Sequence, residues 1–548
     1  MSTVGRSLVA LVAAGGLAAC GSSSSTTSSG TGGATSAGGG TVTVAEGTAP
    51  DFLDPGLGYT TQAANADWLA YTGLYTYAHK AGVEGGTVIP GLASALPQVS
   101  ADGKTYTMTL RSGLTFSNGK PVKASDFAYS IGRSIKLNWG GASFYTGNIV
   151  GATAYGKGTA KTISGIKADD ATGKITVTLL APYGAFPNVL AFPSSGLVPT
   201  GTAMTNLTNS PPPGVGPYVI KNVVPNRSFD VVRNPNWKPL PGIDAGHVDV
   251  KVKINANTQT EAESVLNNTA DAFDWGDTVP PALISQIQST ASGRYTNESS
   301  VSTFYFFLNT KTKPFNNLMA RQAVNMAVDR KAIQKLSSGT IEPGCFFLPP
   351  GMIGHPTGTC PYGETPAVAK AKALVTQAGL AGTPVTVWGE TRSPRKEYID
   401  YYTSVLNSIG FKATEKILAD AQYFPTIGNL KLNPQTGFAD WNQDFPNPSD
   451  FYLLLDGTAI QQTNNQNFGQ VNDPHIQSEL AALNKVPSTQ LQSVAARWAA
   501  LDQYVAKQAY VNVYGAQTHP KFLSTRIDFA SAIFHPVYGN DWSSWRLK

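Results

Sequence analysis

The hydrophobic pattern changes along the chain, from short alternating segments in the first half to longer amphipathic segments in the second. Residues 41–47, TVTVAEG, alternate apolar and polar side chains and end in glycine, which predicts a strand that runs into a turn. Residues 258–268 form a helical segment with Thr258 as the expected N-cap and Glu261 three residues later. Further strands are predicted within 104–122, with a turn at Asn118-Gly119, and over 174–180, 217–237 (two strands) and 247–254.

The second half alternates strands with helices. Residues 304–310, FYFFLNT, are a strongly apolar strand, and 319–336 are predicted to form one amphipathic helix. This alternation is typical of an α/β layer architecture. The remaining predicted elements are helices over 366–379, 397–410 and 489–509, and strands over 383–390 and 412–418.

The N-terminus has the pattern of an export signal. Arg6 precedes an uncharged stretch, 7–19, that is shorter than the ~20 residues needed to span a bilayer but suits a signal-peptide core. A buried N-terminal helix is the alternative, and Gly15-Gly16 disfavours it. Leu17-Ala18-Ala19-Cys20 resembles a bacterial lipobox, which implies that Cys20 is acylated and anchors the mature protein to the cell membrane.

The segment after Cys20 predicts a tether. Residues 21–40 consist of Gly, Ser, Thr and Ala and contain no side chains that could build a core, so we expect disorder. A Gly/Ser chain of this length spans roughly 25 Å on average. The folded part is therefore expected to start near Thr41 and to work outside the cytoplasm.

Length and charge narrow the class of protein. A chain of 548 residues is too long for one ordinary core, so two or three domains are expected. Charged residues make up 14% of the chain, against roughly 25% in an average soluble protein. The net charge is only +5 and there is no dense Lys/Arg run, so we expect no nucleic-acid partner.

Cysteine and histidine positions argue for a disulfide and against a metal site. Cys345 and Cys360 lie close together in an exported chain, which predicts that they are bonded. Zinc would need four nitrogen or sulfur ligands, and only His355 lies between these cysteines. The six histidines are scattered singly, although a nickel chelate held by one histidine stays open. We find no GxSxG motif, phosphate loop or histidine-paired nucleophile, so neither an enzyme nor a cofactor is expected.

Five stretches resemble the bacterial extracytoplasmic solute-binding proteins of the oligopeptide/dipeptide/nickel type (family 5), the receptors of ABC importers. They are residues 100–131, 214–237 (with Gly-Val-Gly-Pro-Tyr leading to Arg-Asn-Pro), 308–333, AKALVTQAG and DFPNPSDF. The resemblance implies a periplasmic-binding-protein type II clamshell with two lobes and three domains. Domain I would comprise 41–81, 200–298 and 512–548, domain II would be an insertion at 82–199, and domain III would be 299–511.

The stretch ADWNQDFPNPSD, 439–450, contains an acid without a nearby cation. No Lys or Arg lies between Lys431 and Lys485. In peptide-binding members of the family an aspartate three residues after a tryptophan receives the ligand's α-ammonium group, and Trp441 and Asp444 reproduce this spacing. A carboxylate gives a desolvated ammonium a charge-assisted hydrogen bond. The alternative is an N-cap or turn aspartate, because Pro446 and Pro448 mark a loop.

Large aromatic side chains are the other candidates for contact with a ligand. Rings can line a cleft at little cost in conformational entropy, and packing in a core is the alternative for each. No arginine for a ligand carboxylate can be singled out, since Arg392 and Arg395, which flank Pro394, could reach the cleft or be solvated. The aromatic candidates are Tyr59, Trp275, Tyr305, Tyr423 and Tyr514.

Together these observations predict a monomeric, lipid-anchored substrate-binding protein of an ABC importer. Its clamshell would close on an oligopeptide, because the ligand binds the closed state better, and would deliver the peptide to the permease and ATPase subunits. A first alternative keeps the fold and changes the ligand to an oligosaccharide, a glycolipid, a nickel chelate or an opine. A second alternative is a cell-envelope regulatory protein, and a third, an extracellular hydrolase, lacks a catalytic constellation.

Overall fold

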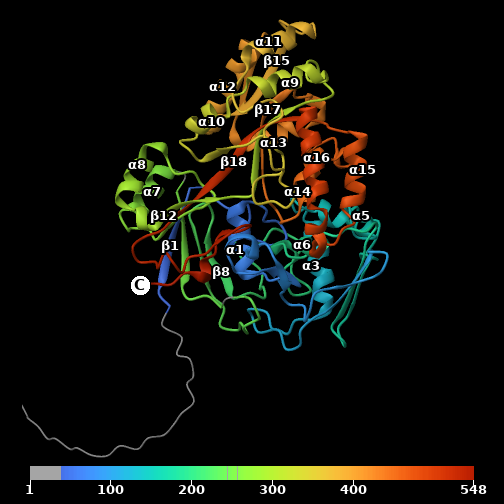
Figure 1. Cartoon of the computed structure of the whole chain (residues 1–548). Coiled ribbons are helices and arrows are strands. Elements are labelled where there is room, and N and C mark those ends of the chain that lie inside the picture. The colour runs from blue at the N-terminus through green and yellow to red at the C-terminus, as the bar shows by residue number, and fades with distance from the viewer. Residues whose placement is uncertain (1–38, 48, 244, 256, 464) are drawn as a thin grey trace, which may run out of the picture. The chain divides into compact units, whose positions relative to one another are not determined.

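The computed structural model describes residues 39–548 except 48, 244, 256 and 464 (Figure 1). The predicted signal segment, Cys20 and the tether up to residue 38 lie outside the described residues. Within residues 39–548 and apart from those four gaps, no helix combines the length and the apolar character that crossing a bilayer requires.

A five-stranded mixed sheet forms the first layer of the structure. Strand β1 (Thr41–Glu46) is parallel to both of its neighbours, β10 and β11, whereas β9 is antiparallel to both β8 and β10. Apolar side chains alternate along β1, so that Val42 and Val44 are buried, as the sequence predicts. In sheet order the strands are β11 (Ala272–Phe273), β1, β10 (Asp249–Ile254), β9 (Ser228–Arg233) and β8 (Tyr218–Val224).

Three helices belong to this part of the fold: α1 (Thr61–Ala70), α7 (Thr258–Leu266) and α8 (Pro281–Thr290). The expected N-cap of α7 is wrong by one residue. Asn257 caps the helix, because its side chain accepts a hydrogen bond from the backbone N–H of Thr260, and Thr258 is the first helical residue.

A four-stranded antiparallel sheet shares one hydrophobic core with the five-stranded sheet. Phe127 and Ile131 of α3 (Ala124–Lys136) belong to the same buried cluster as Val250 of β10. Both groups of the Arg133–Asp54 ion pair are almost fully buried, with N–O distances of 2.5 and 2.7 Å, so α3 is fixed to the loop after β1. The buried hydrophobic cluster that contains Phe127, Ile131 and Val250 is called core 1 below. The strands, in sheet order, are β4 (Gln98–Val99), β5 (Thr105–Thr109), β7 (Lys174–Thr178) and β6 (Ile166–Asp169), with short helices α4 (Ser143–Thr146), α5 (Ala152–Gly156) and α6 (Phe186–Val189).

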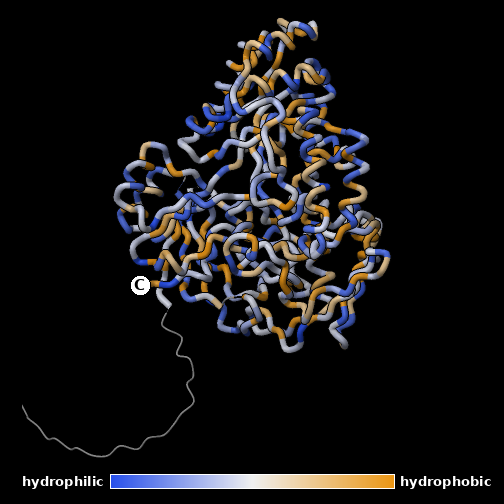
Figure 2. The backbone as a smooth tube through the Cα atoms, in the orientation of Figure 1, coloured by the Kyte–Doolittle hydropathy of each residue, from blue (hydrophilic) through white to orange (hydrophobic). Residues whose placement is uncertain are grey.

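A seven-stranded mixed sheet organises a second hydrophobic cluster, core 2. Every residue of β13 (Ser302–Leu308) is buried, which explains its continuous apolar sequence. Helices cover the sheet, and Figure 2 shows hydrophobic and polar residues interleaved along them, as expected where one face packs on a core. The strand order is β12 (Tyr295–Ser299), β18 (Val511–Phe522), β13, β17 (Thr436–Asn442), β15 (Pro384–Glu390) and β16 (Lys412–Leu418), with β14 (Ile341–Pro343) paired to β18. The helices are α9 (Leu318–Ala327), α10 (Arg330–Leu336), α11 (Val368–Gln377), α12 (Arg395–Ser408), α13 (Asp420–Ile427), α14 (Pro448–Tyr452), α15 (Pro474–Leu483) and α16 (Ala495–Gln508).

Two predicted helices differ from the structure. The segment 319–336 is not one helix, because Val328 is extended and Asp329 caps a second helix by accepting a hydrogen bond from Lys331 N. The segment 489–509 begins with 3₁₀ turns over Ser488–Val494 before α16 starts. In both cases the apolar spacing continues through a backbone break that the pattern alone does not reveal.

Strand β18 connects the two parts of the fold. It pairs with β13 over 511–515 and with β12 over 518–522, and Leu523 then bridges to Ala272 of the first sheet. Arg526 continues the connection with an ion pair of 2.9 Å to Asp271. The C-terminal residues thus return to core 1, where Trp542 and Trp545 are buried.

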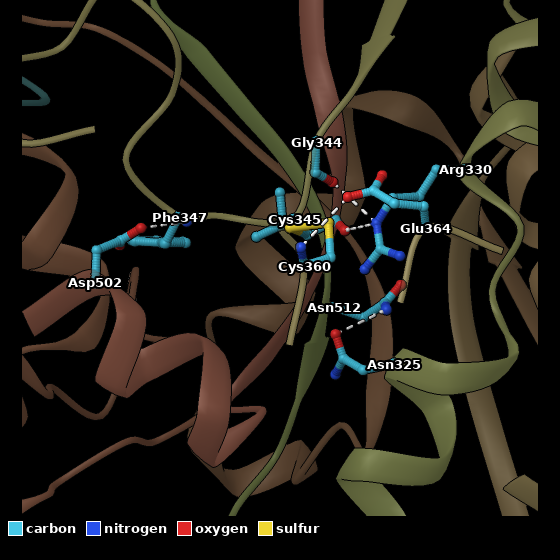
Figure 3. Close-up of a disulfide and its surroundings, with 10 residues drawn as sticks. Asn325, Arg330, Gly344, Cys345, Phe347, Cys360, Glu364, Asp502 and Asn512 are labelled. Carbon is cyan, nitrogen blue, oxygen red and sulfur yellow. Dashed lines mark hydrogen bonds between the residues drawn. A yellow bond between two sulfur atoms is a disulfide. The ribbon is translucent and has the colours of Figure 1, made fainter. Parts of the chain in front are cut away.

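The predicted Cys345–Cys360 disulfide is confirmed (Figure 3). The bond joins residues 15 apart in sequence, in the loop that leads from β14 to α11. Nearby, Arg330 donates from Nε to the carbonyl of Gly344, and Cys360 N donates to Glu364.

Candidate ligand site

Asp444 lies at a contact between core 1 and core 2. It follows β17 of the second sheet, and its Oδ2 accepts a hydrogen bond of 2.7 Å from the hydroxyl of Tyr59. Tyr59 lies in the loop between β1 and α1, and its ring packs against core 1. Asp444 and Tyr59, each predicted separately from the sequence as a ligand contact, are therefore brought together from the two cores.

Asp450 shapes the loop that presents Asp444. Its fully buried carboxylate accepts hydrogen bonds from Asp444 N at 2.8 Å and from Trp441 Nε1 at 3.1 Å. Asn447, rather than Asp444, caps α14 by accepting from Ser449 N. The N-cap alternative for Asp444 is therefore wrong, and its side chain is left to face Tyr59.

The electrostatics of this loop favour an incoming cation. Burial raises the pKa of Asp444 to about 7, and the hydrogen bond from Tyr59 acts in the opposite direction. Burial and then the charge of Asp444 raise the pKa of Asp450 well above its usual range. Across the described residues, no Lys, Arg or His side chain forms an ion pair with either acid. A positively charged group beside Asp444 would stabilise its ionised form.

Aromatic side chains of core 1 pack against the loop 441–450 and against Tyr59, the hydrogen-bond partner of Asp444. Trp139 meets Tyr59 edge to face at 5.3 Å between ring centroids and donates from Nε1 to the carbonyl of Gly58. Phe445 packs against both Phe144 and Phe192, with centroid distances of 5.7 and 6.0 Å. The sequence does not single out Trp139, Phe445 or Asp450, because only the fold brings core 1 against this loop.

A second contact joins the two cores away from Asp444. Gly184 N donates to the carbonyl of Asn484, and Ser488 N donates back to the carbonyl of Gly184. Asn188 Nδ2 adds a hydrogen bond of 2.9 Å to Ser488 Oγ. The two cores therefore contact each other here as well as at Asp444.

Three of the predicted aromatic residues lie inside core 2 and not beside Asp444. Tyr423 donates from its hydroxyl to the carbonyls of Trp388 and Phe438, so its polar atom is used within the core. Tyr305 is 2% exposed and packs edge to face on Phe347. Tyr514 is fully buried beside Phe306.

Trp275 lies at the end of the first sheet, against His519 and Phe534, and is 6% exposed. Trp441 is half-buried and is placed beside Asp444 by its bond to Asp450. Of the seven predicted contact residues, the structure thus assembles Asp444, Tyr59 and Trp441 at one place.

The two arginines considered for a ligand carboxylate lie beside acids of core 2. Arg395 donates to Glu390 at 2.7 Å and to Asp440 at 2.6 Å, and its guanidinium lies 4.3 Å from the ring centroid of Phe438. Arg392 contacts Glu390 at 3.3 Å. Arg395 is therefore engaged by two carboxylates, which does not favour it as the partner of a ligand carboxylate.

A group of acids occupies the carboxyl ends of the parallel strands β1 and β11. Glu46 is 1% exposed, and burial, followed by the charges of Asp274 and Asp277, raises its pKa well above the usual range. Burial and Asp277 likewise raise the pKa of Asp274 to about 8. Glu261 Oε1 accepts from Asp274 N at 2.8 Å. No cluster of acids, cysteines or histidines in the described part of the chain is arranged to hold a metal ion.

Comparison with known proteins assigns the family. Residues 87–463 match the model for bacterial extracellular solute-binding proteins, family 5. The chain belongs to this family. A curated family relative, the glutathione-binding protein GsiB of Shigella flexneri, is 26% identical over 381 residues, which cover 68% of each chain.

Solved structures agree with this family fold. The clavulanic acid biosynthesis oligopeptide binding protein 2 superposes with a TM-score of 0.86 at 21% identity, covering 94% of this chain and 96% of its own. The murein tripeptide binding protein MppA of Escherichia coli gives a TM-score of 0.76 at 20% identity, covering 93% and 99%. The predicted type II periplasmic-binding-protein fold is therefore confirmed, and the family is one of extracytoplasmic binding proteins.

Proposed function

We propose that this protein is the lipid-anchored receptor of an ABC importer and that it binds oligopeptides between its two lobes. Asp444 would receive the α-ammonium group of the peptide. The observation that carries the proposal is the pairing of Asp444 with Tyr59 across the two cores, at an acid that has no cation partner among the described residues.

The geometry supports a coupling of ligand binding to closure. Tyr59 occupies only Oδ2 of Asp444, so Oδ1 is available to an ammonium group. A ligand held there would lie at the contact between the two cores and would stabilise their approach. Differential affinity for the closed state is sufficient to shift the population toward it, without any chemical step.

The relatives support a peptide as the ligand. Their names refer to glutathione, an oligopeptide and a murein tripeptide. Asp444, which has no cation partner among the described residues, favours a ligand with a positive end over a neutral sugar.

Calorimetry with free and N-acetylated alanine peptides of three to five residues tests this proposal. Wild type should bind the free peptides, and acetylation, which removes the ammonium charge, should weaken binding. Asp444→Asn should lose about 2–4 kcal/mol, equivalent to a roughly 30- to 1,000-fold weaker affinity. It should lose little more with acetylated peptides.

Asp400→Asn is the matched control, because it removes one carboxylate charge from the exposed part of α12. Its peptide affinity should equal that of wild type. Equal affinity of wild type for free and acetylated peptides would overturn the role of Asp444 and would favour one of the neutral ligands.

A further inference from the structure

A cavity of about 470 Å³ on core 2 lies apart from the Asp444 loop. Its lining includes Lys311 and Lys313 from the loop after β13, Thr386 and Trp388 from β15, and Asn433 from the turn before β17. None of the residues that line it belongs to the loop 441–450 or to core 1. Its volume falls within the range of small-ligand sites, ~300–1,000 Å³.

Hydrogen bonds hold the walls of this cavity together. Asn309 Nδ2 donates to the carbonyl of Pro434 at 2.8 Å, and Gln435 Nε2 donates to the carbonyl of Lys313 at 2.8 Å. The amide oxygen of Gln435 accepts from Thr386 N at 2.7 Å. These bonds connect the lysine loop, the turn at 433–435 and β15, so the cavity is formed before any ligand arrives.

Two of the residues that line the cavity, Lys311 and Lys313, carry ammonium groups, and Lys416 lies beside a third lining residue, Trp388. Lys416 stands opposite Trp388 in the parallel register of β15 and β16, with its Nζ 4.0 Å from the centroid of a Trp388 ring. Lys311, Lys313 and Lys416 are exposed and form no ion pair with any residue that the structure describes. No carboxylate is among the lining residues.

We propose that this cavity binds a phosphate-bearing anion. A phosphate group carries up to two charges on several oxygens, so separate ammonium groups can each donate to it. The half-buried Thr386 and the exposed Asn433 supply further polar side chains at the same cavity. A free phosphorylated solute and the headgroup of an anionic phospholipid both present this chemistry. The site is independent of the proposed peptide function.

The test uses the full chain with Cys20→Ser, so that no attached lipid contributes to binding. Isothermal calorimetry would measure inorganic phosphate and pyrophosphate, and sedimentation would measure vesicles of phosphatidylcholine with and without phosphatidylglycerol. Lys311→Gln with Lys313→Gln should weaken binding at least about tenfold, corresponding to about 1.4 kcal/mol. Lys251→Gln with Lys253→Gln is the matched control, because it removes the same charge from two exposed lysines of β10 and should bind as wild type does.

The two probes identify the source of the phosphate. Binding of the soluble anions that depends on Lys311 and Lys313 assigns a free solute, whereas the same dependence seen only with phosphatidylglycerol vesicles assigns a lipid headgroup. The proposal is overturned if neither probe binds, or if the two double variants lose equal affinity. Peptide binding should be the same in both double variants, so failure here leaves the proposed function untouched.

Discussion

The hydroxyl of Tyr59 donates a 2.7 Å hydrogen bond to Asp444, although 385 residues separate the two in sequence. Tyr59 is fixed by Trp139 in core 1, and Asp444 by the hydrogen bond from its backbone N–H to Asp450 in core 2. The bond therefore links a residue packed on core 1 to the loop that follows β17, and the candidate ligand acid lies at the contact between the two cores.

Tyr59→Phe should weaken peptide binding roughly tenfold, because a hydrogen bond to a charged group is worth about 1.5–3 kcal/mol and water replaces part of it. The ring and its contact with Trp139 would remain. Tyr155→Phe, which removes a hydroxyl from the surface helix α5, serves as the control. Calorimetry with a free-amine peptide measures both. Unchanged or tighter binding by Tyr59→Phe would show that the ligand displaces the tyrosine.

Removing the disulfide should cost about 3 kcal/mol of unfolding free energy. Cys345→Ser with Cys360→Ser frees a loop of 15 residues in the unfolded chain, and the chain-entropy model gives this magnitude for such a loop. Denaturant titration of the double variant and of reduced wild type measures the loss. The two losses should agree, and an equally stable double variant would contradict the prediction.

Cys20→Ser should abolish membrane attachment, because it removes the thiol that the lipobox pattern predicts to be acylated. Expressed in a bacterium with lipoprotein processing, wild type should fractionate with membranes and the variant should not. Ser22→Ala is a control in the predicted tether and should behave as wild type does. A Cys20→Ser protein retained on membranes to the same extent would argue against the anchor.

The acids at the end of the first sheet should make the protein less stable as pH rises. Their folded-state pKa values are raised, to about 8 for Asp274, so the folded state holds protons that the unfolded state releases above its ordinary carboxyl pKa of about 4. The stabilisation is fully present below pH 4 and is lost as pH rises through 8. Glu46→Gln should therefore lose less stability than wild type between pH 5 and pH 8.

Chemical denaturation at both pH values measures this difference, with the exposed Glu342→Gln as control. The control should follow wild type. A Glu46→Gln variant whose stability has the same pH dependence as that of wild type would show that the folded-state pKa of Glu46 is not raised as expected.

Local patterns account for what the sequence alone predicts correctly. Alternation along β1 and the apolar run of β13 define strands because the period of side chains on a sheet is two residues. Outside the lipobox the chain has only two cysteines, Cys345 and Cys360, which leaves a single intramolecular pairing. The five motifs, taken in order, indicate the family and hence the fold.

The tertiary structure decided which of the candidates share a site. Asp444 and Tyr59 meet where Phe445 packs against Phe144 and Phe192, and no local pattern encodes a contact between such distant segments. Tyr423 is the kind of residue that often contacts a ligand. Its side chain nevertheless lies in the core, where its hydroxyl donates to two strand carbonyls. Sequence periodicity reports which side chains are buried, whereas a binding site depends on which buried and polar groups from separate elements converge, and only the packing of the whole chain determines that.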